Sequence, residues 1–487
     1  MFAEFVFEQS GAKYTNRILI IDSDNLISST KITEVFKAHN FEVIHYKNDL
    51  DLRLNFEDKI KSNTGCIAIF VDKDQYVPYD IIRRMRVYNL SLRSLFSRLN
   101  SKALIELGID KFDLVTSAYE NNFERCESYE QTKKFIDLSV YSSQNVSNYL
   151  KVTYELILSK SSVCKDCLDW FFIAEEKARI DCIAAKHNVS LDTSEINKRF
   201  RDYILNQYKN LSTAISSKSP ILVSKAIEFI RNNSEKFILI VMDGMSEFDW
   251  HILSNSFKKI NYIQTAAYAM IPTVTSVSRQ CLLSNKYPIQ LESPWNQAKE
   301  KNEFIECLKQ HGLNDNQISY QRGYDAEFGP LVKCGAVIIN EIDDLVHAQK
   351  YGREGMYRDV NMILKQGKLA KMTRSFLSLG YDVYITADHG NTLRCGMGKL
   401  TSTGVELETK SKCMLVLKNF ANKHDLQTRF GLIDFPKYFL PKEFDYLICN
   451  VGDSFDIKGD KVMSHGGISI DECIVPFIVI KAKDNNV

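Results

Sequence analysis

The chain has 487 residues, of which 45% are hydrophobic and 25% charged, and its formal net charge is +1. This length exceeds what one hydrophobic core usually serves and predicts two or three domains. The near-neutral charge excludes an overall basic field for nucleic acid, although a local basic groove is compatible with it. No stretch is apolar over the length of a membrane span, and acids interrupt the first residues, which is unlike a signal peptide.

The first part of the chain alternates short apolar runs with helical patterns, which predicts a small α/β domain with a parallel sheet over residues 1–85. The expected strands lie within Arg17–Asp24, where a turn follows the strand, and at Phe41–Tyr46 and Cys66–Val71, with helices near 25–38 and 50–61.

Residues 86–234 have apolar positions three and four apart, which predicts a helical middle region. The expected helices are Ser91–Leu107, Val146–Leu158, Cys167–Lys186 and Leu191–Leu211.

Twelve cysteines are scattered through the chain without the spacing of a disulfide framework. Together with the lack of a signal peptide, this predicts reduced thiols and a cytoplasmic protein. Cys164 and Cys167 have the spacing of a metal or redox pair, but no second pair lies nearby. We expect them to be partly buried structural thiols.

Residues 235–487 return to the α/β pattern and predict a third domain. Apolar strands are expected at Phe237–Met242, Tyr268–Ile271, Ala336–Asn340, Tyr384–Ala387, Met414–Leu417 and Cys473–Ile480.

Three of these strands end in side chains that bind metals, and a fourth candidate lies in the loop before the last strand. In a mostly parallel sheet such strand ends meet at one edge. Adjacent Asp388 and His389 can face one ion only if the chain turns, which Gly390 allows. Oxygen and nitrogen ligands without thiolates favour two Zn²⁺ or Mn²⁺ ions, which can clamp a phosphoryl displacement. The candidate ligands are Asp243, Asp343, His347, Asp388, His389 and His465.

Thr275 lies where a strand passes into a helix, whose N-terminus stabilises negative charge. A metal could activate its hydroxyl as a nucleophile, and Arg279, one helical turn on, could form a fork on phosphate oxygens. Capping of the helix by the local threonines and serines explains the segment when it is taken alone. Because three strand ends carry potential metal ligands, we expect Thr275 to take part in catalysis and not only in capping the helix.

The order Asp, Thr, Asp-x-x-x-His, Asp-His-Gly, His is similar to that of the alkaline phosphatase superfamily in its phosphodiesterase layout. More narrowly, Val-Met-Asp-Gly-Met-Ser, Pro-Thr-x-Thr-Ser-x-Ser-Arg, Thr-Ala-Asp-His-Gly and Ser-His-Gly-Gly-Ile-Ser resemble the PglZ domain, over about Phe237–Lys481. The resemblance implies an alkaline-phosphatase-like α/β/α core preceded by the small α/β domain and the helical segment.

The same resemblance implies a site. One metal would be held by Asp243, Thr275, Asp388 and His389, and the other by Asp343, His347 and His465. Thr275 would attack phosphorus, and water would then hydrolyse the phosphothreonine.

The implied function is a metal-dependent phosphodiesterase or nuclease-like hydrolase in BREX-type anti-phage defence. Its implied partners are a phosphoester such as a nucleotide or nucleic acid and other defence proteins, with no membrane. A non-hydrolytic metal-binding scaffold or regulatory component of a defence complex is the alternative.

Overall fold

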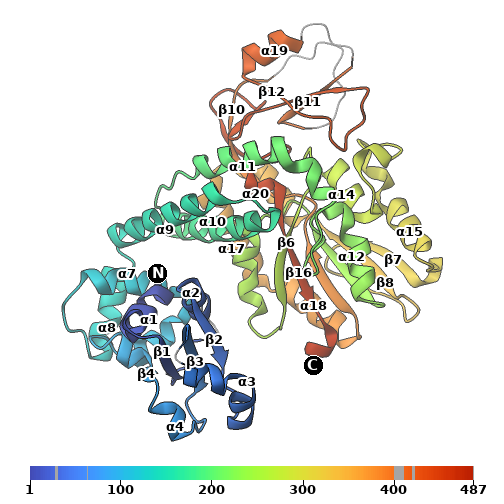
Figure 1. Ribbon diagram of the computed structural model, residues 1–487. Helices are drawn as coiled ribbons and strands as arrows, with labels where there is room; N and C mark the ends of the chain where they lie inside the picture. Colours follow the sequence, from blue (N-terminus) through green and yellow to red (C-terminus); the bar gives the residue numbers. More distant parts are fainter. Residues whose placement is uncertain (28–30, 63, 400–410, 419–422, 486–487) are drawn as a thin grey trace. The chain divides into compact units, whose positions relative to one another are not determined.

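A computed structural model describes the chain except residues 28–30, 63, 400–410, 419–422 and 486–487 (Figure 1). The chain divides into two compact units, Met1–Tyr149 and Leu150–Val487. The helical middle region predicted at 86–234 is therefore shared between both units. The three functional domains predicted from the sequence stay a prediction.

The first unit is built on a four-stranded parallel sheet of order β2-β3-β1-β4. The three strands predicted from the sequence are confirmed, and β4 extends the sheet past residue 85. β4 was missed because it is a largely exposed edge strand, Arg-Val-Tyr-Asn-Leu, without an apolar run. The strands are β1 (Arg17–Asp22), β2 (Phe41–His45), β3 (Cys66–Asp72) and β4 (Arg86–Leu90).

Helices complete this unit, and buried phenylalanines from several of them pack together. Phe2 and Phe5 of the first helix contact Phe96, and Phe2 also contacts Phe112. The helices are α1 (Phe2–Ser10), α2 (Ile32–Ala38), α3 (Asp49–Ser62), α4 (Tyr79–Ile82), α5 (Leu92–Leu95), α6 (Ser101–Leu107), α7 (Phe112–Asn121) and α8 (Tyr129–Phe135).

The second unit is built around a six-stranded sheet of order β6-β16-β9-β5-β8-β7. Strands β5, β7, β8 and β9 run parallel, and β16 pairs antiparallel with β6 and β9. All six residues of central β5 are buried, as a strand covered on both faces requires. The strands are β5 (Phe237–Met242), β6 (Ile263–Tyr268), β7 (Ile318–Arg322), β8 (Cys334–Ile339), β9 (Asp382–Thr386) and β16 (Ile474–Ile480).

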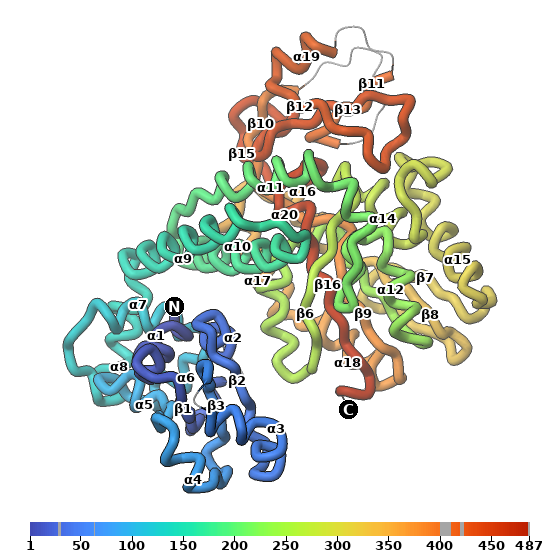
Figure 2. Tube along the Cα trace, viewed as in Figure 1, coloured from blue at the N-terminus to red at the C-terminus, as the bar shows by residue number. Residues whose placement is uncertain are grey.

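Helices flank this sheet, so the predicted α/β/α core is confirmed (Figures 1 and 2). Helices α10, α13 and α17 contact one another, and α14 contacts α12 and α15. None of the described helices has the length and apolar character needed to cross a bilayer. The boundary between the two units falls within α9 (Ser143–Val163). The other helices of the second unit are α10 (Cys167–His187), α11 (Ser194–Gln207), α12 (Ala226–Asn233), α13 (Glu247–Leu253), α14 (Thr275–Ser284), α15 (Glu300–Gln310), α16 (Glu341–Ala348), α17 (Gly352–Gln366), α18 (Lys368–Ser378), α19 (Lys423–Phe430) and α20 (Ile470–Cys473).

Two small sheets complete the second unit, with orders β14-β10-β15 and β11-β13-β12. The first of them carries the loop between β15 and α20, which contains His465. The strands are β10 (Thr392–Gly396), β11 (Met414–Leu417), β12 (Ile433–Asp434), β13 (Asp445–Ile448), β14 (Asp453–Ser454) and β15 (Lys461–Ser464).

Helix α10 is tied to the rest of this unit by a buried lysine. Lys177 is 2% exposed, and its ammonium group donates to Asp471 Oδ1 of α20 and to Asp181 Oδ2, each at 2.7 Å. A hydrogen bond from Tyr268 Oη of β6 to the Cys167 carbonyl, 2.8 Å long, joins the start of the same helix to the sheet. The helical segment after residue 150 is therefore built into the second unit.

The expected partial burial of Cys164 and Cys167 is confirmed. Cys164 is half-buried, Cys167 is buried, and both are free thiols. Burial raises the pKa of Cys164 to about 11, and burial together with Asp166 raises that of Cys167 to about 12. Neither belongs to a potential metal-binding group among the described residues.

Candidate metal centre

The order of the main sheet brings the predicted strand ends together. Because β9, β5 and β8 are neighbours and run parallel, their carboxyl ends lie side by side. Asp243 directly follows β5, Asp388 and His389 follow β9, and Asp343 lies in the first turn of α16, after β8.

The first group consists of Asp243, Asp388 and His389, all buried, whose potential ligand atoms lie within 4.8 Å of one another. His389 Nε2 is 3.7 Å from Asp243 Oδ1 and 3.8 Å from Asp388 Oδ2. Thr275, the first residue of α14, has its Oγ1 3.1 Å from His389 Nε2 and 3.5 Å from Asp243 Oδ1. The hydroxyl therefore faces the same point as the three ligands.

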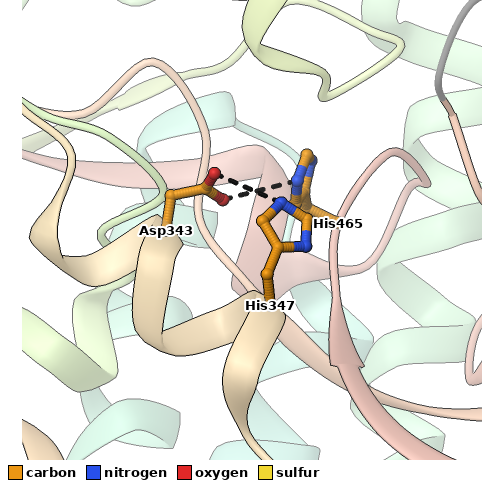
Figure 3. Close-up of side chains that lie close together, drawn as sticks. All are labelled: Asp343, His347 and His465. Carbon is orange, nitrogen blue, oxygen red and sulfur yellow. Dashed lines mark ion pairs between the residues drawn. The ribbon is translucent and has the colours of Figure 1, made fainter.

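The second group consists of Asp343, His347 and His465 (Figure 3). Asp343 and His347 lie one turn apart on α16, and His347 Nε2 is 3.2 Å from Asp343 Oδ2. His465 arrives from the loop after β15 and places Nε2 3.5 Å from Asp343 Oδ1. The rings of His465 and His389 stack with centroids 4.1 Å apart, so the two groups adjoin.

Backbone carbonyls set the orientation of two of the histidine rings. His389 Nδ1 lies 3.0 Å from the Gly390 carbonyl, and His465 Nδ1 lies 2.9 Å from the Thr273 carbonyl. Because a carbonyl can only accept, Nδ1 carries a proton in both rings, and in the neutral ring Nε2 keeps its lone pair. Metal-binding histidines are held in this way in proteins.

Thr273 and Glu472 hold the loop that carries His465. Thr273 Oγ1 accepts from Gly466 N at 2.9 Å and donates to Glu472 Oε2 at 2.9 Å. Glu472 is fully buried, also accepts from Gly467 N at 2.7 Å, and pairs with the guanidinium of Arg394. The loop is thus fixed against the segment that leads into Thr275.

Gly390 has a different role from the predicted one. Its φ is not positive; the lack of a side chain matters because a Cβ there would lie 2.1 Å from the Asp471 carbonyl oxygen. Close packing against α20, more than backbone freedom, requires a glycine beside the ligands.

The electrostatics of the two groups differ. Burial, followed by repulsion from Asp243, raises the pKa of Asp388 to about 7. Burial, followed by the nearby His389, lowers the pKa of His465 to about 4, so this ring is neutral at pH 7. Burial would raise the pKa of Asp343, but the hydrogen bond from His347 and the neighbouring histidines lower it overall.

The residues present fit divalent cations. Asp388 Oδ2 and Asp343 Oδ1, one from each group, are buried and have no hydrogen-bond partner among the described residues. A buried carboxylate oxygen without a partner is costly, and a cation bound beside it would remove that cost. The carboxylate and imidazole donors suit Zn²⁺ or Mn²⁺.

Arg279 lies on the predicted helix face, but its guanidinium is bound within the protein. Its side chain is 0% exposed; Nη1 donates to Asp243 Oδ2 at 2.5 Å and Nε to Glu300 Oε2 at 2.7 Å. The prediction of a fork on phosphate oxygens is therefore corrected. Arg279 lies one turn beyond Thr275, as predicted, but its guanidinium binds the Asp243 carboxylate and is not free to bind a substrate phosphate.

Two residues that support the site were missed by sequence reasoning. Asn391 donates through Nδ2 to the Gly244 carbonyl at 2.9 Å and to Asp249 Oδ2 at 2.6 Å, which ties the loop after β9 to the turn after β5. Its position directly after Asp-His-Gly was a usable signal. Glu300 had no local signal, because only the tertiary fold brings the start of α15 to Arg279.

Comparison with known proteins shows the family. The model of the BREX system PglZ alkaline phosphatase-like domain matches residues 222–480, which is more than half of the chain. No curated protein matches.

Similar solved structures include human ectonucleotide pyrophosphatase/phosphodiesterase 5, with 14% identity and a TM-score of 0.38, covering 51% of this chain and 90% of that one. The murine protein of the same name has 10% identity and a TM-score of 0.36, covering 50% and 87%. Phosphonoacetate hydrolase from Sinorhizobium meliloti 1021 with phosphonoformate has 11% identity and a TM-score of 0.33, covering 50% and 90%. With its motifs, its sheet and the family match in agreement, the chain belongs to the PglZ family of alkaline phosphatase-like domains.

Proposed function

We propose that this chain is a metal-dependent phosphoester hydrolase of the phosphodiesterase type, with Thr275 as its nucleophile. One observation carries the proposal: the Thr275 hydroxyl lies 3.1 Å from His389 Nε2 and 3.5 Å from Asp243 Oδ1, within a buried group of ligands that adjoins a second, partly exposed group. Membership of an alkaline phosphatase-like family supports the same chemistry.

Asp243, Thr275, Asp388 and His389 would hold one divalent metal, and Asp343, His347 and His465 a second, Zn²⁺ or Mn²⁺. When bound, the two cations would lower the pKa of the nucleophilic hydroxyl and offset the charge of the transferred phosphoryl group.

The residues of the chain supply the rest of the reaction. Thr275 loses its proton and attacks phosphorus, and as the new P–Oγ bond forms the bond to the leaving oxygen breaks. The leaving group takes up a proton, and water then cleaves the phosphothreonine and restores the hydroxyl. The N-terminus of α14, at Thr275, favours the negative charge that develops there.

The proposal extends to substrate and setting. The BREX description of the family motivates a nucleotide or nucleic-acid phosphodiester as substrate, in anti-phage defence alongside other defence proteins. All twelve cysteines are unpaired, which favours a reducing compartment such as the cytoplasm.

The test compares wild type with Thr275→Ala on bis-p-nitrophenyl phosphate, after reconstitution with Zn²⁺ or Mn²⁺. Ser276→Ala is the matched control, because this adjacent hydroxyl has no hydrogen bond to a described residue and belongs to neither ligand group. Loss of a nucleophile lowers turnover by about 10⁴-fold or more. We expect that loss in Thr275→Ala, nearly unchanged metal content, and turnover near wild type in Ser276→Ala.

Two results would contradict the proposal. Wild-type turnover in Thr275→Ala would remove the nucleophile assignment. Less than one metal per wild-type chain, with no gain in activity on reconstitution, would exclude the metal-dependent hydrolase and favour the scaffold alternative. Comparing turnover of mono- and bis-p-nitrophenyl phosphate would separate a phosphomonoesterase from a phosphodiesterase.

A further inference from the structure

A chain of buried charges extends from the first ligand group toward α15. Glu300, the first residue of α15, is 3% exposed and accepts from Arg279 Nε at 2.7 Å. The same carboxylate accepts from Tyr320 Oη at 2.5 Å and pairs with the guanidinium of Arg322, both on β7. The charges thus alternate from Arg322 through Glu300 and Arg279 to the Asp243 carboxylate.

Because Arg279 binds one carboxylate oxygen of Asp243, the two oxygens of this residue have different partners. Oδ2 accepts from Arg279 Nη1, whereas Oδ1 faces Thr275 Oγ1 and His389 Nε2. A single oxygen of Asp243 is therefore presented to the point where the ligand atoms converge. Residues that orient a metal ligand in this way affect metal affinity although they never touch the ion.

Arg279 also carries a positive charge next to the place proposed for a dication. Its Nη1 is 3.8 Å from Asp388 Oδ2, and its Nη2 is buried without a hydrogen-bond partner among the described residues. An uncompensated guanidinium there would repel a bound dication and compete with it for both carboxylates. The Glu300 carboxylate, on the far side of the guanidinium, offsets this charge and holds the group in place.

We propose that Glu300 is a positioning residue that acts through Arg279 on Asp243 and sets the metal affinity of the Asp243, Asp388 and His389 group. This inference rests on the proposed function, since it assumes that this group binds a metal. It assigns a role to a carboxylate 57 residues from Asp243 in the sequence, on an element that contributes no ligand of its own.

The test measures zinc affinity by competition with a chromogenic chelator in wild type and in Glu300→Gln. The amide keeps the size of the side chain but loses its charge. Replacing residues that orient metal ligands typically weakens metal binding about 10- to 100-fold. We expect one of the two zinc equivalents to weaken by that factor and the other to stay near its wild-type affinity.

Two further variants separate this role from general loosening of the fold. Glu303→Gln removes a carboxylate of the same helix that pairs with Lys286 Nζ at 2.6 Å, and it should leave both zinc affinities unchanged. Arg322→Gln removes the half-exposed partner of Glu300 and frees its charge for Arg279. Because single exposed ion pairs contribute up to about 1 kcal/mol, zinc should bind to Arg322→Gln equally or up to about fivefold more tightly.

The outcomes are distinct. If wild type binds two zinc equivalents and the zinc affinities of Glu300→Gln lie within twofold of the wild-type values, the inference fails while the proposed function stands. A loss in Glu303→Gln or Arg322→Gln equal to that in Glu300→Gln would do the same, because the effect would then be structural. Wild type that binds no zinc or manganese would overturn the proposed function, and the inference with it. If Glu300→Gln fails to fold, weaker zinc binding by Arg322→Gln would overturn the inference, and equal or tighter binding would support it.

Discussion

Replacing Asp388 with asparagine should stabilise the metal-free protein while it removes metal binding. Asp388 is completely buried, and its pKa rises from 3.8 to about 7 because of burial and then of repulsion from Asp243. A folded state that holds the proton more tightly than the unfolded state loses stability as the pH rises between those two values. At pH 8, keeping this carboxylate ionised costs the fold about 4 kcal/mol.

An amide cannot ionise, so Asp388→Asn should recover much of this cost at pH 8. The gain should fall to less than half at pH 5 and vanish below pH 4, where the acid is protonated in both states. The measurement is urea unfolding in the presence of a chelator, repeated with excess Zn²⁺. Zinc at 100 times its dissociation constant stabilises a folded protein by about 2.7 kcal/mol per site. Wild type should show this stabilisation at both sites, and Asp388→Asn should lack it at one.

The control is Asp382→Asn, at the start of β9, the strand that Asp388 follows. Asp382 Oδ2 accepts from Ser234 Oγ at 2.6 Å and from Lys481 Nζ at 2.9 Å, and its pKa is lowered. Its amide variant should therefore lose stability at pH 8. If metal-free Asp388→Asn also loses stability at pH 8, Asp388 is a structural carboxylate and the reasoning fails.

Two other measurements bear on the ligand groups. Thr273→Val removes the hydroxyl that accepts from Gly466 N and donates to Glu472. This should lower the free energy of unfolding in urea by about 1–3 kcal/mol and weaken zinc binding near His465. Unchanged zinc affinity would show that the Thr273 hydroxyl is not needed to hold His465 in place. Zinc affinity should fall at least about tenfold for each pH unit below 7, because Asp388 and His389, whose pKa values are both raised, must release protons to bind the ion. Competition titrations at pH 5, 6 and 8 check this, and a constant affinity would contradict the raised pKa.

The sequence predicts the location of the site well because its signals are local. An apolar run that ends in Asp243, or in Asp388 and His389, identifies both a buried strand and a polar strand end. The rule that parallel strands end at one edge then brings these residues together without knowledge of the full topology. The structure adds that β9, β5 and β8 are immediate neighbours.

The supporting residues could not be predicted in the same way. Arg279 lies on the expected helix face, but which partner it meets there depends on the position of α15, fixed by a connection with no regular pattern. Strand β4 is held by its pairing with β1 and has no apolar alternation of its own. In both cases the deciding contact joins segments distant in the sequence.

The buried ammonium of Lys177 has a consequence for how this fold can be divided. The family match begins at residue 222, but a fragment cut there would lack α10 and would take the Lys177 ammonium away from Asp471, whose remaining cation would be Arg353, with Nη2 3.4 Å away. Asp471 lies one residue before Glu472 and contacts the Gly390 turn. Removing one partner of a buried ion pair costs up to about 3–5 kcal/mol, and less where a second cation stays nearby. A fragment meant to keep the site intact should therefore begin near Leu150, where the second unit begins. Fusions and truncations should include the helical segment that precedes residue 222.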